Sequence, residues 1–274
     1  MVTIDDIRKA AYDNGISGKP VCVHSSLKSF GHVKGGPRTV IDGLLAEGCT
    51  VMVPTFVSTF WAKPRPDSKR IERNAYNYDA IYNSWKCNKI YTPESNDVDE
   101  VFIGAIPAAL LKINGRWRGN HPMDSFAAVG PLAETLISRQ TPKNIYGPFE
   151  ALVENDGFIV LMGVDLNRMT FIHYAEQMSG RNLFVRWGNT SAGMSIESYV
   201  GGCSEGFTNL ESALRQIRRD VQVGESRWMI FPAKEALSAL VDAIHTDSQI
   251  THCPDPDCIR CRDAIAGGPI LEGR

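Results

Sequence analysis

The sequence predicts a layered α/β domain built around a mixed sheet. Short apolar runs of strand length alternate along the chain with segments in which apolar residues recur at helical spacing. The 274 residues are enough to bury a sizeable core, and 43% hydrophobic with 22% charged residues is ordinary globular composition. No internal repeat or low-complexity segment is visible, so we expect one domain over residues 1–274.

The first half of the chain begins this alternation. Residues 3–14 are expected to form a helix, because apolar residues recur at helical spacing after Thr3 and Asn14-Gly15 is a typical helix end. Residues 57–97 are irregular and rich in aromatic side chains, which is typical of a binding loop or a lid. The other expected elements here are strands at 20–23 and 50–54 and helices at 39–45, 101–112 and 131–137.

The second half continues in the same order. The small residues at 127–130 suit a strand packed closely against a neighbour, and an apolar, β-branched run of strand length begins at Phe158. The remaining expected strands are 185–187, 195–199 and 228–231, and the expected helices are 150–154, 170–176, 210–221 and 233–245.

Charge and hydropathy favour a small-molecule partner in the cytoplasm. The net charge is −2 with Lys and Arg dispersed, so no basic stripe indicates nucleic acid. No apolar run reaches the roughly 20 residues that span a bilayer, and the acidic N-terminus is unlike a signal peptide. Seven cysteines, most of them isolated, fit a reducing compartment.

A general base is expected where the strand from Phe158 leads into a helix. Thr170 is placed to cap that helix through its hydroxyl group. His173 and Glu176 are three residues apart, so they share a helical face and the carboxylate can hold the imidazole in one tautomer. Such a pair suits proton abstraction, although an ordinary structural His–Glu pair has the same spacing.

The Ser- and Gly-rich segment after residue 23 is a candidate anion-binding loop. It runs from His24 to Pro37, between an expected strand and an expected helix. Small residues let backbone N–H groups reach a phosphate, and Lys28 or Lys34 can add charge. The glycine spacing matches neither the NTPase phosphate loop nor the dinucleotide fingerprint, and a plain strand-to-helix connection is the alternative.

The C-terminal tail, residues 252–261, carries four soft metal ligands. They are His252, Cys253, Cys258 and Cys261, and the last two have the spacing of a zinc knuckle. A structural zinc ion and a Pro-rich turn with reduced cysteines are the two alternatives. In the irregular 57–97 segment, Asp79 is a candidate contact for a cationic substrate, with a solvated loop carboxylate as the alternative.

Several of these segments together resemble the aminoglycoside 3-N-acetyltransferase family, which is also called the antibiotic N-acetyltransferase family. They occur in the family's order over about residues 20 to 180. The matching segments are His24–Gly31 with Gly35–Pro37, Val53–Phe56, Gly104–Pro107, Arg118–Pro122 with Ser125–Gly130, Gly147–Pro148, and Leu161–Val164 through Thr170, His173 and Glu176.

The resemblance implies a three-layer α/β/α fold with a central mixed sheet, unlike the GNAT acetyltransferases. It also implies transfer of an acetyl group from acetyl-CoA to an amine of an aminoglycoside, the 3-amino group of 2-deoxystreptamine, with a role in antibiotic resistance. His173 would be the base and Glu176 would orient it. Phe56, Asp79 and Glu176 would contact the acceptor. The implied CoA contacts are His24, Ser25, Ser26, Leu27, Lys28, Phe30, Gly31, Val33, Gly35 and Gly36 of the first loop, together with His121 and Ser125.

Three alternatives to this function stay open. A biosynthetic N-acyltransferase would act on another amine or aminosugar with the same machinery. A metallohydrolase would use His173 and Glu176 as ligands, but no second His follows at zincin spacing. A zinc-binding module without catalysis would leave the first loop and the His–Glu pair without a role. We expect a monomer or a homodimer.

Overall fold

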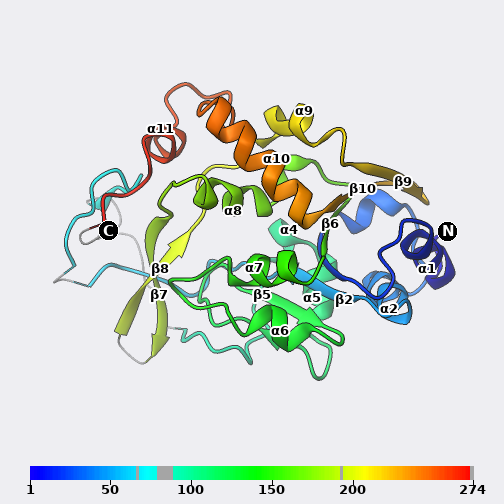
Figure 1. The fold of residues 1–274 in the computed structure, drawn as a ribbon. Coiled ribbons are helices and arrows are strands. Elements are labelled where there is room, and N and C mark those ends of the chain that lie inside the picture. Colours follow the sequence, from blue (N-terminus) through cyan, green and yellow to red (C-terminus); the bar gives the residue numbers. More distant parts are fainter. Residues whose placement is uncertain (66–67, 79–88, 192–193, 272–274) are drawn as a thin grey trace.

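A seven-stranded mixed sheet forms the centre of the molecule (Figure 1). The computed structural model describes residues 1–65, 68–78, 89–191 and 194–271. The strand order is β4-β5-β2-β1-β6-β10-β9, in which β1 is parallel to β2 and β6 and the other pairs are antiparallel. The predicted mixed sheet is therefore confirmed. The strands are β1 (Pro20–Ser25), β2 (Thr50–Pro54), β4 (Trp117–Arg118), β5 (Phe126–Val129), β6 (Phe158–Met162), β9 (Arg219–Val223) and β10 (Ser226–Pro232).

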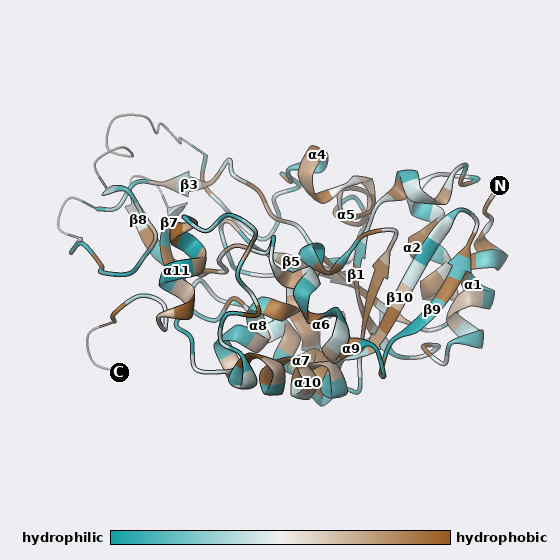
Figure 2. Cartoon of the chain, turned by 90° about the horizontal axis from the view of Figure 1, so that it is seen from above, coloured by the Kyte–Doolittle hydropathy of each residue, from teal (hydrophilic) through white to brown (hydrophobic). Residues whose placement is uncertain are grey.

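Helices cover both faces of this sheet, which confirms the three-layer fold. Successive residues of a strand point to opposite faces, so β6 places Ile159 and Leu161 in one apolar cluster and Val160 and Met162 in the other. Figure 2 shows α7 and α10 on one side of the central strands and α2 and α5 on the other. One helical layer holds α1 (Ile4–Asp13), α2 (Pro37–Ala46) and α5 (Ala105–Leu110), and the other holds α6 (Ala133–Ile137), α7 (Gly147–Glu154), α8 (Phe171–Met178) and α10 (Ala233–Thr246).

A second, three-stranded sheet lies away from the N-terminus (Figure 1). It contains β3 (Trp61–Ala62), β7 (Phe184–Ser191) and β8 (Met194–Val200), so the strands expected near 185–187 and 195–199 are present. The short helix α11 (Ile259–Ile265) lies beside it, with the chain's C-terminal end. The remaining short helices are α4 (Glu100–Ile103), α9 (Glu211–Leu214), η1 (Leu27–Phe30), η2 (Leu166–Arg168) and η3 (Phe207–Leu210).

Two expected helices differ in the structure. The helix expected at 101–112 is split into α4 and α5 at Gly104, whose φ of 101° lies in the left-handed region that favours glycine. The helix expected at 210–221 ends at Leu214, and the chain then forms β9. Polar and apolar residues alternate from Asp220 to Val223, and this period of two suits an edge strand paired with β10.

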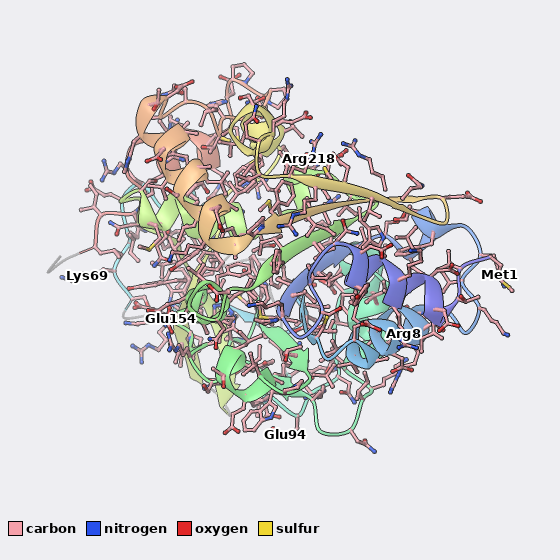
Figure 3. The ribbon with its side chains drawn as sticks, turned by 45° about the vertical axis from the view of Figure 1, so that its right-hand side comes forward. Met1, Arg8, Lys69, Glu94, Glu154 and Arg218 are labelled. Atoms are coloured by element: carbon pink, nitrogen blue, oxygen red, sulfur yellow. The ribbon has the colours of Figure 1, made fainter. Side chains whose placement is uncertain are left out.

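Charged side chains lie at the outside of these layers. Figure 3 labels Arg8, Glu94, Glu154 and Arg218 on separate parts of the ribbon. Arg8 donates to Glu47 at 2.9 Å, and Arg218 donates to Asp220 at the same distance. Exposed pairs of this kind contribute at most about 1 kcal/mol each, so the apolar layers dominate the stability. Among the described residues, no helix combines the length and the apolar character needed to cross a bilayer.

Candidate active site

The two central parallel strands bring two loops together at one edge of the sheet. In β1 and β6, His24 pairs with Leu161 and Ser25 pairs with Met162. The N–H of Ser26 then donates to the carbonyl oxygen of Met162 at 2.9 Å. Ligands of open α/β sheets bind outside the carboxyl ends of parallel strands. The loop after β1 and the segment that leads from β6 into α8 therefore border the same space.

A cleft of about 1120 Å³ occupies this space. Its lining comes from the loop after β1, from α4, from the start of α8 and from the segment after β8. Small-molecule sites usually enclose about 300–1,000 Å³, so this cleft has room for two reactants. The first loop and His173, which the sequence treats as two halves of one site, border the same cavity.

His173 forms part of the cleft wall. Its Nδ1 lies 2.8 Å from Oε2 of Glu176. Because an ionised carboxylate can only accept, Nδ1 carries the proton and Nε2 is left as the acceptor. The ring packs edge-on against Phe207, with the ring centroids 4.7 Å apart. The imidazole is therefore held in the tautomer that a general base requires.

Glu176 lies behind His173 and does not line the cleft. It is buried, and its second oxygen, Oε1, accepts from Nη1 of Arg181 at 2.6 Å. Both carboxylate oxygens are thus engaged by side chains, one by His173 and the other by Arg181. This corrects the expectation that Glu176 also contacts the acceptor, because its buried carboxylate is directed away from the cleft.

The expected helix cap at Thr170 is wrong. Thr170 has helical backbone angles, φ −54° and ψ −24°, and its side chain makes no capping bond. The chain enters α8 almost directly from η2, so the first N–H groups find backbone partners: Ile172 donates to Met169 and His173 to Thr170, each at 3.0 Å. Thr170 lines the cleft instead.

Only the first part of the expected anion-binding loop reaches the cleft. His24, Ser25, Ser26, Leu27 and Lys28 line it. The chain then turns into the core, where the ring of Phe30 packs edge-on against Trp228 at a centroid distance of 6.0 Å. The expected contacts that lie away from the cleft are Phe30, Gly31, Val33, Gly35 and Gly36.

Ser25 presents an unpaired polar atom at this wall. Its Oγ is buried and has no hydrogen-bond partner within the described part of the chain. An unpaired buried hydroxyl is costly, so this atom is suited to a ligand in the cleft. The neighbouring His24 is buried, and burial lowers its pKa to about 3. His24 is therefore neutral at pH 7.

His121 and Ser125 support the wall from behind. Nδ1 of His121 accepts from the N–H of Asp124 at 2.9 Å, and its Nε2 donates to the carbonyl oxygen of Tyr199 at 3.0 Å. Burial lowers the pKa of His121 to about 3. Oγ of Ser125 accepts from Nε of Arg118 at 2.9 Å. Neither side chain lines the cleft, which corrects their expected place on the CoA side.

Asp124, which stands between these two residues, does line the cleft. Burial raises the pKa of its carboxyl group to about 7, against the opposing effects of His173 when it is protonated and of Arg186. Its carbonyl oxygen accepts from Nε2 of Gln140 at 3.0 Å, so the backbone below it is fixed. The sequence analysis missed Asp124. Its position between His121 and Ser125, two expected site residues, was the signal that could have identified it.

Other charged residues of the cleft come from separate parts of the chain. Phe56 lines the cleft as expected, whereas Asp79 lies outside the described residues. Apart from Lys28 of the first loop, no local motif marks the remaining charged lining residues, because distant segments bring them together. They are Lys28, Glu100, Arg168, Arg186, Glu205 and Arg260.

The segment after β8 approaches His173 closely through Gly201. A Cβ atom at Gly201 would lie 2.6 Å from Cδ2 of His173 and 2.7 Å from Oη of Tyr146. Only a residue without a side chain fits there. Gly202, Cys203, Ser204 and Glu205 follow and also line the cleft. The Gly201–Gly206 loop therefore positions the imidazole as well as forming the wall.

The cysteines of the tail gather with a partner that the sequence analysis did not consider. Sγ atoms of Cys203, Cys253, Cys258 and Cys261 lie within 4.8 Å of one another. His252 is not in this group, and its Nδ1 donates to the carbonyl oxygen of Cys253 at 2.7 Å. The group of candidate metal ligands therefore contains Cys203 where the sequence analysis expected His252.

Comparisons with known proteins agree with this geometry. The profile of the family described as aminoglycoside 3-N-acetyltransferase matches residues 22–245. Aminoglycoside N(3)-acetyltransferase IX from Micromonospora chalcea is 31% identical over 196 residues. That alignment covers 65% of this chain and 63% of the curated relative, so the chain spans less than two thirds of the relative's length.

Solved structures share the fold over nearly the whole chain. The aminoglycoside acetyltransferase AAC(3)-IVa apoenzyme superposes with a TM-score of 0.77, covering 97% of this chain and 98% of the other, at 20% identity. AAC-IIIb, solved as a binary complex with CoASH, superposes with a TM-score of 0.71 over 93% of this chain and 99% of the other, at 19% identity.

Substitution of Gly201 by alanine should disturb the His173 wall. The added Cβ forces the imidazole or the loop to move, and overpacking of this kind costs about 1–3 kcal/mol of unfolding free energy. Denaturant titration measures that loss, and NMR of the histidine ring reports the displacement. Ser204→Ala in the same loop is the matched control. Unchanged stability together with unchanged ring resonances would contradict this packing.

Proposed function

Since the chain belongs to the aminoglycoside 3-N-acetyltransferase family, we propose that it transfers an acetyl group from acetyl-CoA to an amino group of an aminoglycoside. The proposed acceptor is the 3-amino group of 2-deoxystreptamine, and the proposed role is antibiotic resistance. The observation that carries this proposal is the single cleft bordered by the first loop, by His173 and by Asp124. The names of the relatives support the substrate class.

His173 is the proposed general base. An aliphatic amine is mostly protonated near pH 7, so it must lose a proton before or during its attack on a carbonyl carbon. Nε2 of His173 accepts that proton. Glu176 stabilises the imidazolium that results and keeps the proton on Nδ1, at 2.8 Å. Arg181 holds the other oxygen of Glu176, so the carboxylate keeps its orientation throughout.

The first loop is the proposed site for the cosubstrate. Acetyl-CoA supplies the acetyl group as a thioester, and its phosphates need cationic and N–H donors. Ser25, through its unpaired Oγ, and Lys28 offer such donors on the cleft wall. Arg168 adds a second cation, with its guanidinium 5.0 Å from the centroid of the Phe102 ring. The CoASH complex of AAC-IIIb supports this cosubstrate.

Carboxylates are the proposed contacts for the acceptor. Aminoglycosides carry several ammonium groups, and Asp124, Glu100 and Glu205 line the same cleft. Phe56 adds an apolar wall, packed edge-on against Phe126 at a centroid distance of 5.5 Å. Asp124 is the contact proposed nearest to the base, because it lines the same cleft as His173 and the two groups interact electrostatically.

The proposal extends to the remaining expectations. A structural zinc ion is proposed in the tail, with Cys253, Cys258 and Cys261 among its ligands, because thiolates are soft donors that suit zinc. The free cysteines support a reducing compartment such as the cytoplasm. A single domain over 1–274 and a monomeric or homodimeric state stay predictions.

Incubation of the protein with acetyl-CoA and a panel of aminoglycosides should release free CoA thiol. We expect turnover with compounds that contain 2-deoxystreptamine, because Asp124, Glu100 and Glu205 in the cleft can bind their ammonium groups. A thiol-reactive dye follows the rate, and two-dimensional NMR of the product identifies the acetylated nitrogen. Turnover confined to other amines would point to a biosynthetic acyltransferase. The absence of turnover with any amine would contradict the proposed activity.

Replacement of His173 by alanine should lower turnover by on the order of 10²-fold or more, which is the usual contribution of a general base. The same thiol-release assay measures this loss. His32→Ala is the matched control, because His32 is exposed and does not line the cleft. Near-normal turnover of the His173 variant would assign the base to another residue.

The affinity for a cationic acceptor should rise with pH near neutrality. The carboxyl group of Asp124, with a pKa of about 7, is neutral below that pH and negative above it. Its ionised fraction rises from about a tenth at pH 6 to about nine-tenths at pH 8. Calorimetric binding of an aminoglycoside, without acetyl-CoA, should therefore strengthen by up to about tenfold between these pH values.

Asp124→Asn should flatten this pH dependence, and the difference from the wild type isolates the carboxylate. Glu100→Gln serves as the control, because Glu100 lines the same cleft but is exposed. A pH dependence that persists unchanged in Asp124→Asn would show that another group controls acceptor binding.

A further inference from the structure

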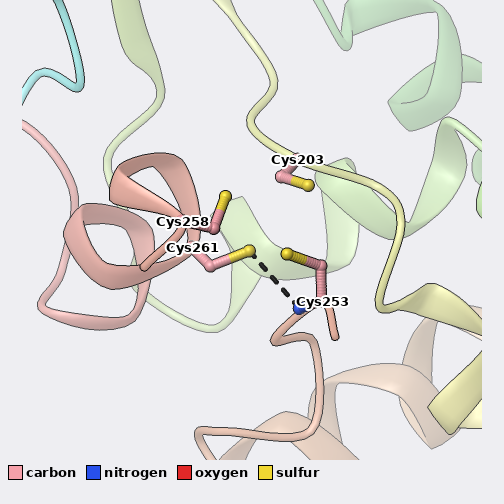
Figure 4. A group of neighbouring side chains, drawn as sticks. All are labelled: Cys203, Cys253, Cys258 and Cys261. Atoms are coloured by element: carbon pink, nitrogen blue, oxygen red, sulfur yellow. Dashed lines mark hydrogen bonds between the residues drawn. The ribbon is translucent and has the colours of Figure 1, made fainter. Parts of the chain in front are cut away.

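Four cysteine thiols from three separate segments meet beside the cleft (Figure 4). The four Sγ atoms lie within 4.8 Å of one another. Cys203 follows β8, Cys253 follows α10, and Cys258 and Cys261 lie at the start of α11. Three of the four are buried, and all four are free thiols. Cys253, Cys258 and Cys261 belong to the tail, and the fold adds Cys203, which lies 50 residues earlier in the sequence.

The spacing of the thiols suits one tetrahedral metal ion. At a Zn–S distance of about 2.3 Å, tetrahedral sulfur atoms lie about 3.8 Å apart, whereas a disulfide requires about 2.05 Å. An all-thiolate set without a carboxylate or an imidazole is typical of structural zinc. The N–H of Cys253 also donates to Sγ of Cys261 at 3.4 Å, and such outer bonds orient metal ligands.

We propose that Cys203, Cys253, Cys258 and Cys261 hold a structural Zn²⁺ ion that fixes the Gly201–Gly206 loop beside His173. The new elements are the fourth ligand, Cys203, and the mechanical link from the ion to the cleft. Only the catalytic consequence of this link rests on the proposed function. The metal site itself stands on the geometry of the four thiols.

The loop is held at both of its ends. At its start, Gly201 leaves no space for a side chain between its backbone and the ring of His173. At its end, a Cβ atom on Gly206 would lie 2.4 Å from the carbonyl oxygens of Thr251 and His252, so the loop packs directly on the tail. Cys203 lies between these two contacts. A zinc ion would join the middle of the loop to the same tail.

The tail also holds the partner of the His173 carboxylate. Nη1 of Arg181 donates to Oε1 of Glu176 at 2.6 Å and to Oγ1 of Thr251 at 2.8 Å. Its Nη2 donates to the carbonyl oxygen of Ser248 at 2.7 Å. The segment just before the cysteines therefore contacts the His–Glu pair through Arg181. Loss of the ion should loosen the imidazole from two directions.

Metal analysis of the chain, purified without chelator, tests the site. We expect about one zinc and no iron per chain by mass spectrometry, and X-ray absorption at the zinc edge should show four sulfur neighbours at about 2.3 Å. Three sulfurs with one nitrogen would restore His252 as the ligand. Absence of stoichiometric zinc, the presence of iron, or a disulfide in non-reducing peptide mapping would each overturn the proposal.

Two variants separate the candidate fourth ligands. Cys203→Ser should weaken zinc binding by at least the roughly 10- to 100-fold that loss of an outer-shell partner costs. His252→Ala should leave the zinc content unchanged. The opposite result would contradict the assignment. If Cys203→Ser does not fold, X-ray absorption of the wild type still decides between the two ligands.

Hydrogen exchange tests the link to the cleft without reference to activity. Removal of zinc by a chelator should raise the exchange rates of amides in 201–206 and in α8 by about tenfold or more, because local opening becomes cheaper. Amides of α1, in the opposite layer, are the internal control. Faster exchange limited to α11 would show that the ion stabilises only the tail, which would contradict the link to the cleft. An acetyl group found on Cys203 after incubation with acetyl-CoA alone would show that Cys203 is an acyl acceptor and not a zinc ligand.

Discussion

The parallel pairing of β1 with β6 is the constraint on which the rest of the site depends. Both strands are buried on both faces, so a slip of one residue would turn every apolar side chain to the wrong layer. The register of Ser25 opposite Met162 is therefore fixed by the core. As a result, the first loop and the segment that leads to the helix of His173 start from neighbouring points. The packing of the apolar layers thus determines where the polar side chains of the site lie.

The sequence was sufficient for the parts of this arrangement that depend on local pattern. Apolar runs identified the central strands, and the three-residue spacing of His173 and Glu176 identified the pair that the structure shows at 2.8 Å. It was insufficient where the direction of a side chain matters. Glu176 and His121 are buried behind the cleft wall, and the first loop turns inward once Phe30 enters the core. Residue type and spacing do not distinguish the wall of a cavity from the layer behind it.

Long-range contacts explain the residues that the sequence analysis missed. Asp124 reaches the cleft because His121 and Gln140 fix its backbone, and no local signal records the position of Gln140. Cys203 is isolated in the sequence, and only the fold brings it to the cysteines of the tail. Arg181 follows α8 by a few residues, but its partners Ser248 and Thr251 come from the other side of α10. The contacts of Cys203 and of Arg181 with the tail join segments that lie about 50 or more residues apart in the sequence, which no local motif spans.

The buried charges next to His173 explain why the tail matters to the cleft. A buried carboxylate is stable only with a charged and hydrogen-bonded partner. A neutral His173 cannot provide this alone, because it offers a hydrogen bond from Nδ1 but no charge. Arg181 supplies the permanent positive charge, and it pairs with the second oxygen of Glu176 whatever the charge of the imidazole. Since Arg181 is itself held by Ser248 and Thr251, the segment that precedes the cysteine cluster is part of the electrostatic support of the imidazole.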